Sequence, residues 1–150
     1  MGAPCVLASL GASDPGPRKH YREERSPYNP AMDARAVGVF DSGMGGLTVL
    51  HECLVTMPHE DFVYLGDHAR LPYGPRTREE VRRFAHEIGL YLEALGVKIV
   101  VVACNTATSA ALPDLQERLD VPVVSVIVPE AHAAVQATAR TNGDASRARR

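Results

Sequence analysis

The chain has 150 residues, of which 45% are hydrophobic and 23% are charged, and its formal net charge is −2. This length is typical of one domain, and this apolar fraction is enough for a buried core, which excludes a wholly disordered protein. No apolar run approaches the roughly 20 residues of a membrane span, and the apolar residues 5–12 lack the basic flank of a secretory signal. We therefore expect a cytoplasmic protein with no membrane partner.

The charges and the cysteines exclude further classes. Residues 1–34 are neutral, residues 139–150 carry four arginines against one aspartate, and the stretch between them is acidic. An acidic domain lacks the basic surface that binds phosphate backbones, so we expect no nucleic-acid partner. Cys5, Cys53 and Cys104 cannot all pair with one another and have no metal-ligand spacing, which argues against a disulfide framework and a zinc site.

The two ends of the chain differ in composition from the middle. Residues 1–34 contain five of the eleven prolines and show no apolar periodicity, so we interpret them as a flexible extension. Residues 139–150 also lack a pattern and are predicted to be a disordered tail. The folded domain is therefore expected at residues 35–138.

Within this domain, short apolar runs alternate with helical patterns. A strand is predicted at residues 36–40, before a glycine cluster and a helix that begins near Leu47. A second strand at 61–65 precedes the most regular helix, whose start is indicated by a capping box of Thr77 and Glu80. The remaining elements are a strand at 97–102, a weaker helix at 112–119, a strand at 121–127 and an alanine-rich helix from about Pro129.

This alternation predicts an α/β fold with a parallel sheet and helices on both faces. The β-branched run at 97–102 is the best candidate for the centre of the sheet. Ligands of such sheets bind at the carboxyl ends of the strands, where helix N-termini present free N–H groups. The candidate site therefore comprises the residues just after Phe40, Leu65, Val102 and Ile127.

The loop after the first strand begins with Asp41 and Ser42 and contains three glycines in residues 43–46. The carboxylate and the hydroxyl could contact a ligand, or one of them could simply cap the next helix. A dinucleotide fingerprint would need a glycine in place of Thr48, and a phosphate-binding loop would need a Gly-Lys pair that is missing here. A nucleotide-binding lobe remains an alternative, because Asp67 follows the second strand where a ribose-binding acid would stand.

Cys104 follows the third strand at the start of the next helix, and a helix N-terminus lowers the pKa of a thiol. Asn105, Thr106 and Thr108 could hold a carboxylate or an amino group there. The alternative is that Cys104 is a small buried hydrophobic residue, as most free cysteines are. Cys53 lies on the apolar side of the first helix and is interpreted as core.

The loop at residues 66–76 is long for a strand-to-helix connection, and long loops in compact domains are often functional. Tyr73 could offer a phenol to a polar ligand, and Gly74 a backbone N–H group. The alternative is a rigid proline turn. The six histidines form no pair at ligand spacing, so no metal site is predicted.

Four segments taken together, VFDSGMGGLTV at 39–49, YLGD at 64–67, PYG at 72–74 and ACNTA at 103–107, resemble glutamate racemases of the aspartate/glutamate racemase family. The resemblance implies a cofactor-independent isomerase that interconverts L- and D-glutamate for peptidoglycan synthesis with two thiols. It implies these roles: Asp41 and Ser42 contact the substrate, Tyr73 and Gly74 line its pocket, Cys104 is a catalytic base that Asp41 orients or helps to deprotonate, and Asn105 and Thr106 bind the amino acid.

The resemblance also implies a two-lobed protein whose second lobe supplies the partner cysteine in a Gly-Cys-Thr-His motif. These 150 residues do not contain that motif, and Ser125 and Val128 replace a glycine and a glutamate common in the family. We therefore expect one lobe with one of the two thiols, and an exposed apolar face that leads to self-association or contacts a second lobe. The alternative hypothesis is a non-catalytic lobe that binds a dicarboxylic amino acid or a partner.

Overall fold

A computed structural model describes residues 5–9, 33–127, 132–136 and 138 of the chain. In this part of the chain, parallel strands form one sheet in the order β1-β3-β2-β4-β5. The strands are β1 (Cys5–Ser9), β2 (Val37–Asp41), β3 (Phe62–Gly66), β4 (Ile99–Val102) and β5 (Val123–Ser125), and the helices between them are α1 (Leu47–Thr56), α2 (Arg78–Ala94) and α3 (Asn105–Arg118). None of these helices has the length and apolar character of a membrane span.

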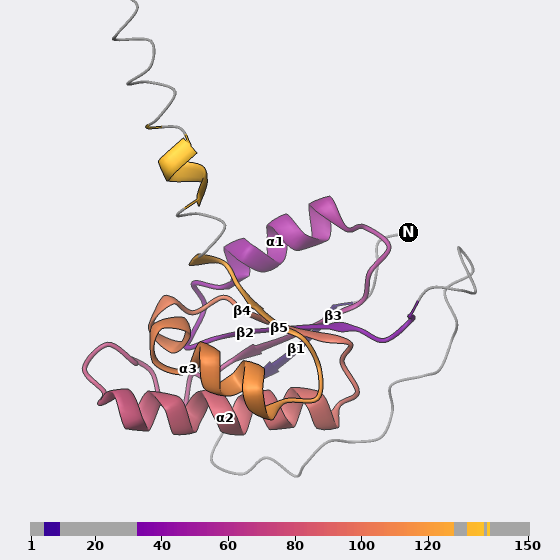
Figure 1. The fold of residues 1–150 in the computed structure, drawn as a ribbon. Helices are drawn as coiled ribbons and strands as arrows, with labels where there is room; N and C mark the ends of the chain where they lie inside the picture. Colours follow the sequence, from indigo (N-terminus) through magenta and orange to yellow (C-terminus); the bar gives the residue numbers. More distant parts are fainter. Residues whose placement is uncertain (1–4, 10–32, 128–131, 137, 139–150) are drawn as a thin grey trace, which may run out of the picture.

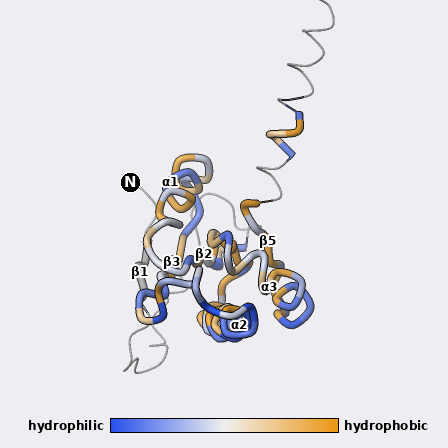
Figure 2. The backbone as a smooth tube through the Cα atoms, turned by 90° about the vertical axis from the view of Figure 1, so that its left-hand side faces the viewer, coloured by the Kyte–Doolittle hydropathy of each residue, from blue (hydrophilic) through white to orange (hydrophobic). Residues whose placement is uncertain are grey.

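Helices cover both faces of the sheet, which confirms the predicted fold class. Helix α1 lies on one face, while α2 and α3 lie side by side on the other (Figures 1 and 2). This arrangement follows from the strand order, because the chain moves from β2 outward to β3, then crosses back over β2 to β4 and on to β5.

The two faces bury unequal cores. Under α2 and α3 lies a large cluster that includes Phe40, Leu65, Ile88 and Leu115. The cluster under α1 is smaller, with Val37, Val39, Leu50, Phe62 and Tyr64 as its buried members. Strand β4 reflects this difference, since Val100 and Val102 are fully buried whereas Ile99 and Val101 are only partly buried. The β4–β5 side of the α1 face is thus the less covered part of the sheet.

Helix α2 begins where its capping box was predicted. The Thr77 hydroxyl accepts the backbone N–H of Glu80 at 3.2 Å, and the Glu80 carboxylate accepts the backbone N–H of Thr77 at 2.9 Å. Gly89 allows α3 to approach this helix closely, because an added Cβ would lie 2.9 Å from Cδ1 of Leu119. The long helix is therefore fixed at its start by polar bonds and along its length by packing.

The structure corrects two of the predictions. The centre of the sheet is β2, not the strand predicted at 97–102, because a β-branched run indicates burial and does not encode the order of strands. Residues 5–9, predicted to belong to a flexible extension, form β1 along the edge of β3. The other predicted extension residues 1–4 and 10–32, and the predicted tail at 139–150, lie outside the described residues.

The element bounds also differ from the predicted ones. Helix α3 covers Asn105–Arg118, so it extends further toward the N-terminus than the helical pattern at 112–119, and it begins at Cys104 as the position of that residue predicted. Strand β5 covers only Val123–Ser125 of the predicted 121–127. Residues 132–136 are helical, as predicted, but 128–131 lie outside the described part of the chain.

Candidate functional site

The carboxyl ends of three neighbouring strands meet at one edge of the sheet. Asp41 ends β2, Asp67 directly follows β3, and Cys104 lies two residues after β4. The backbone N–H of Asp67 donates to the carbonyl of Asp41 at 3.0 Å, and that of Ala103 donates to the carbonyl of Phe40 at 2.9 Å. These bonds hold the three chain segments that were predicted to build the site against one another.

The carboxylate of Asp41 shapes the loop that follows β2. Its Oδ2 accepts the backbone N–H groups of Gly43 at 3.0 Å and Gly46 at 3.1 Å, and the residue is only 7% exposed. Gly46 is required here, since an added Cβ would lie 2.7 Å from Cβ of Asp41. Gly46 is also the N-cap residue of α1, so neither Asp41 nor Ser42, which is half-buried, caps this helix as the alternative interpretation proposed.

Tyr64 interacts electrostatically with two of the candidate residues, Asp41 and Cys104. Its hydroxyl donates to the carbonyl of Gly43 at 2.9 Å. Burial raises the pKa of Tyr64 to about 12, and the negative charges of Asp41 and Cys104 add to this rise. No hydrogen bond joins Asp41 to Cys104 in the part of the chain that the structure describes, so the orientation of the thiol by Asp41 stays a prediction.

Cys104 is the N-cap residue of α3. Its Sγ accepts the backbone N–H of Ala107 at 3.4 Å, and the residue is 4% exposed within the large core cluster. The thiol therefore combines the helix start predicted for a reactive cysteine with the burial of the alternative interpretation. Cys53 is partly buried on α1, where burial, and then Glu52, raise the pKa of its thiol and disfavour the reactive thiolate.

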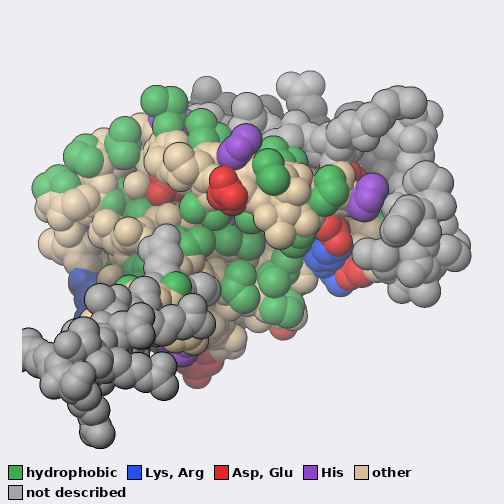
Figure 3. All heavy atoms as spheres, turned by 90° about the horizontal axis from the view of Figure 1, so that it is seen from above, with side chains coloured by type: hydrophobic (Ala, Val, Ile, Leu, Met, Phe, Trp, Pro, Cys, Tyr) green, Lys and Arg blue, Asp and Glu red, His purple; other side chains and the backbone are tan. Residues whose placement is uncertain are grey.

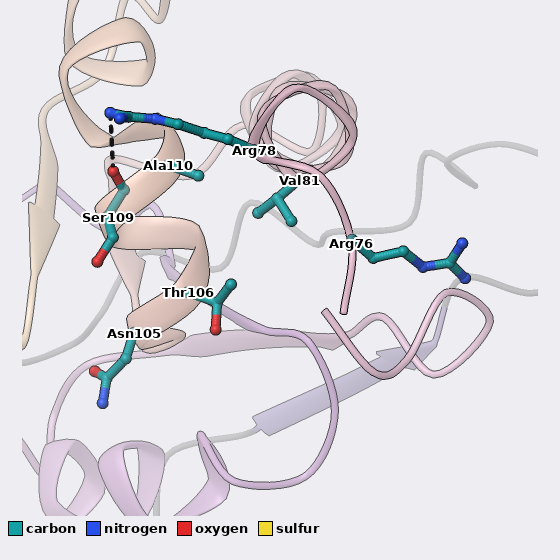
Figure 4. Close-up of a pocket in the computed structure, with 7 residues that line it drawn as sticks. All are labelled: Arg76, Arg78, Val81, Asn105, Thr106, Ser109 and Ala110. Atoms are coloured by element: carbon teal, nitrogen blue, oxygen red, sulfur yellow. Dashed lines mark hydrogen bonds between the residues drawn. The ribbon is translucent and has the colours of Figure 1, made fainter. Parts of the chain in front are cut away.

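A cavity of about 460 Å³ lies between the starts of α2 and α3 (Figure 4). Asn105 and Thr106 line it from the first turn of α3, and their role in binding the amino acid stays a prediction. The guanidinium of Arg78 crosses from α2 to the carbonyl of Ser109 at 3.2 Å, whereas Arg76 points away from Asn105 and Thr106. The other lining residues are Val81, Ser109 and Ala110.

The two arginines and Ser109 were not predicted as lining residues. Two features of the sequence could have indicated them. Ser109 lies four residues after Asn105, on the same face of α3, and Arg78 lies at the start of the neighbouring helix. Thr108, in contrast, was a candidate but is buried, and its hydroxyl donates to the carbonyl of Cys104 at 2.9 Å.

The loop after β3 places Tyr73 in the protein interior. Tyr73 is 2% exposed, and its hydroxyl donates to Oδ2 of Asp67 at 2.5 Å, while Gly74 is exposed with open space beside it. Asp67 is fully buried, so it cannot reach a ribose, and the nucleotide-binding alternative loses its basis. Among the described residues, no group of three metal-ligating side chains is placed to hold a metal ion.

Known proteins share this architecture and sequence. A glutamate racemase from Listeria monocytogenes is 55% identical over 104 residues, which are 69% of this chain and 39% of that protein. The glutamate racemase from Thermus thermophilus, solved with β-chloro-D-alanine, is 57% identical with a TM-score of 0.65, covering 67% of this chain and 40% of its own. That from Francisella tularensis, solved with D-glutamate, is 41% identical with a TM-score of 0.62, covering 65% and 37%.

The parallel sheet and the order of its site segments thus define an α/β lobe of the kind found in amino-acid racemases. Residues 48–143 match the model of the Asp/Glu/Hydantoin racemase family. The chain belongs to this family, which confirms the resemblance found in its sequence. It spans about two fifths of the length of the relatives described above.

Proposed function

We propose that this chain is the N-terminal lobe of a glutamate racemase, which interconverts L- and D-glutamate in the cytoplasm and supplies D-glutamate for peptidoglycan. The observation that carries the proposal is the position of Cys104, which follows the interior strand β4, caps α3 and interacts electrostatically with Tyr64 and with the candidate residue Tyr73. The family match and the relatives named glutamate racemase support the same substrate.

The chemistry explains why a thiol stands at this point. The α-proton of an amino acid is weakly acidic, so its removal without a cofactor needs a strong base in a site that excludes water. The Cys104 thiolate takes that proton, and the positive end of α3 stabilises negative charge at its first turn. A second thiol on the opposite face of the substrate then donates a proton to the carbanion, which inverts the centre.

The remaining candidates hold the substrate in this proposal. Asn105 and Thr106 are exposed at the start of α3, where an amide, a hydroxyl and backbone N–H groups suit a carboxylate. Ser42 and Gly74, in the loops after β2 and β3, contact the substrate in this proposal. Asp41 orients the site through the Gly43–Gly46 loop that its carboxylate folds.

Deuterium exchange at the α-carbon tests the proposal. The chain is incubated with L-glutamate in deuterium oxide, and NMR follows the α-proton signal while chiral chromatography follows D-glutamate. We expect loss of the α-proton signal that is abolished by Cys104→Ser and preserved by the matched control Cys53→Ser. Exchange without D-glutamate indicates that Cys104 works without the second thiol, whereas exchange that survives Cys104→Ser contradicts the proposal.

A second candidate is a lobe that binds glutamate without turning it over. It is favoured by the 4% exposure of Cys104 and by the missing Gly-Cys-Thr-His motif in the 150 residues. Saturable glutamate binding in calorimetry, unchanged by Cys104→Ser and accompanied by no exchange, would favour this candidate. Absence of both binding and exchange would remove both candidates for this chain.

We further propose that the α1 face contacts a second lobe or a second copy of the chain. Hydrophobic side chains gather on this face (Figure 3). Ile99 and Val101 are only partly buried there, and Val124, which pairs with Val101 and so lies on the same face, is 43% exposed. Large exposed apolar patches mark interaction surfaces, so this face supports an association partner.

A further inference from the structure

The group that the proposed chemistry leaves unused is Asp67, a carboxylate with no solvent exposure. Its Oδ2 accepts two strong hydrogen bonds, from the Tyr73 hydroxyl at 2.5 Å and from Nε of Arg70 at 2.6 Å. Its Oδ1 is also buried but accepts no hydrogen bond from the residues that the structure describes. Burying a carboxylate in this way is costly, and such groups persist where their position has a use.

Asp67 joins the Tyr73 loop to the rest of the candidate site. Its backbone N–H donates to the carbonyl of Asp41, and its side chain holds Tyr73, six residues further along the loop. Tyr73 lies in the same buried cluster as Cys104, and a negative charge on Cys104 contributes to the raised pKa of Tyr73. The phenol therefore shares the core with the thiol and lies within its electrostatic range, while its own proton is directed toward Asp67.

Arg70 completes this unit. It bridges Asp67 and Glu87, and its guanidinium lies 4.5 Å from the centre of the Phe84 ring. Tyr73 packs on the same ring, with the two ring centres 5.6 Å apart. The loop is thus joined to α2 by the Arg70–Glu87 ion pair and by the contacts with Phe84, while the Arg70–Asp67 ion pair compensates the charge of Asp67 within the loop.

We propose that Asp67 is a positioning residue, which holds the Tyr73 ring beside Cys104 and thereby controls access to this thiol and the course of the Gly74 backbone. It touches no reacting atom and acts through Tyr73. The inference rests on the proposed function for its biological meaning, but the geometric claim concerns only the exposure of one sulfur.

Alkylation of the full chain tests this claim without any substrate. Iodoacetamide is added near pH 8, and peptide mass spectrometry measures the alkylation rates of Cys104 and Cys53 in the same sample. Cys53 is part of α1, which packs on the opposite face of the sheet from α3. Its alkylation rate therefore serves as an internal reference for general loosening of the fold. The quantity compared between variants is the ratio of the two rates.

We expect Asp67→Asn to raise the ratio of Cys104 to Cys53 alkylation about fivefold or more. The reason is that a neutral acceptor holds the Tyr73 hydroxyl less strongly, so the loop at residues 66–76 opens locally more often. Tyr73→Phe, which keeps the ring and removes the hydroxyl, should shift the ratio in the same direction. If Asp67 acts through Tyr73, the alkylation ratio of the double variant should be close to that of the more affected single variant. If the two residues act independently, their effects on the ratio should multiply. Asp61→Asn, which changes a half-buried carboxylate before the other end of β3, is the matched control and should leave the ratio unchanged.

An unchanged ratio in folded Asp67→Asn would overturn the inference, as would multiplying effects in the double variant. Should Asp67→Asn not fold, Tyr73→Phe alone decides, and an unchanged ratio then also overturns it. Glutamate exchange and binding are measured separately on the parent chain. A parent chain that neither binds nor exchanges glutamate therefore disproves the proposed function and leaves the alkylation result to decide the role of Asp67.

Discussion

The Tyr64 hydroxyl donates to the carbonyl of Gly43 in the loop after β2, and its ionisation links pH to stability. Burial raises its pKa from 10.0 to about 12. Between these values the unfolded chain loses the phenol proton while the folded chain keeps it, so stability that is complete below pH 10 is lost as the pH rises to about 12. The loss is about 3 kcal/mol, given 1.36 kcal/mol per pKa unit.

Tyr64→Phe should remove this part of the alkaline loss. At neutral pH the variant loses the hydrogen bond to Gly43 and is less stable by about 1 kcal/mol. Urea unfolding from pH 7 to 12 should show the gap between variant and parent closing above pH 10. Two stability curves that stay parallel throughout would contradict the assigned pKa shift. Tyr73 shifts in the same direction, but it does so in both proteins.

At the residue scale, the sequence predicted where the candidate residues lie along the fold but not the bonds between them. Cys104, Asn105 and Thr106 could be predicted because they follow a clear strand, and local pattern is enough to place a strand end. The bond from Tyr73 to Asp67 could not be predicted, because it depends on how a long loop folds over α2. The two hydrogen bonds that Asp41 accepts from backbone N–H groups could not be predicted either. Its carboxylate could have contacted a ligand or capped a helix, and the motif fits both roles.

At the scale of elements, the start of α2 makes the clearest prediction. Thr77→Ala removes the acceptor for the Glu80 N–H and should lower the free energy of unfolding by about 1 kcal/mol. Thr77→Ser should restore most of it, because serine also caps well. Thr56→Ala, at the exposed last residue of α1, is the matched control and should change stability by less than about 0.5 kcal/mol. Chemical denaturation measures all three, and an equal loss in Thr56→Ala would contradict a specific capping effect.

The elements also explain which parts of the fold were predictable. The helix α2 was located because capping and apolar period are both local signals. Strand β1 was not, since its five residues gain their strand character from pairing with β3, more than 50 residues away in the sequence. The order of strands is likewise a long-range property, so the β-branched residues of β4 predicted the burial of Val100 and Val102 correctly and the centre of the sheet incorrectly.

For the whole molecule, the unequal cover of the two sheet faces predicts association. We expect the parent chain to self-associate in sedimentation velocity experiments, with the equilibrium shifted toward monomer by Val124→Glu on the α1 face. A charge there opposes burial against another apolar surface. The control is Leu90→Glu on α2, which changes a residue of similar exposure, 51% against 43%, on the other side of the sheet. A parent that is a compact monomer at all concentrations, or an equal effect of both variants, would contradict the assignment of this face.

The sulfur of Cys104 serves the fold as well as the proposed reaction, because it accepts the Ala107 N–H at the start of α3. A covalent inhibitor that captures this sulfur therefore also weakens the first turn of the helix. Hydrogen–deuterium exchange at the Ala107 amide would then report target engagement directly, in a screen that needs neither glutamate nor turnover.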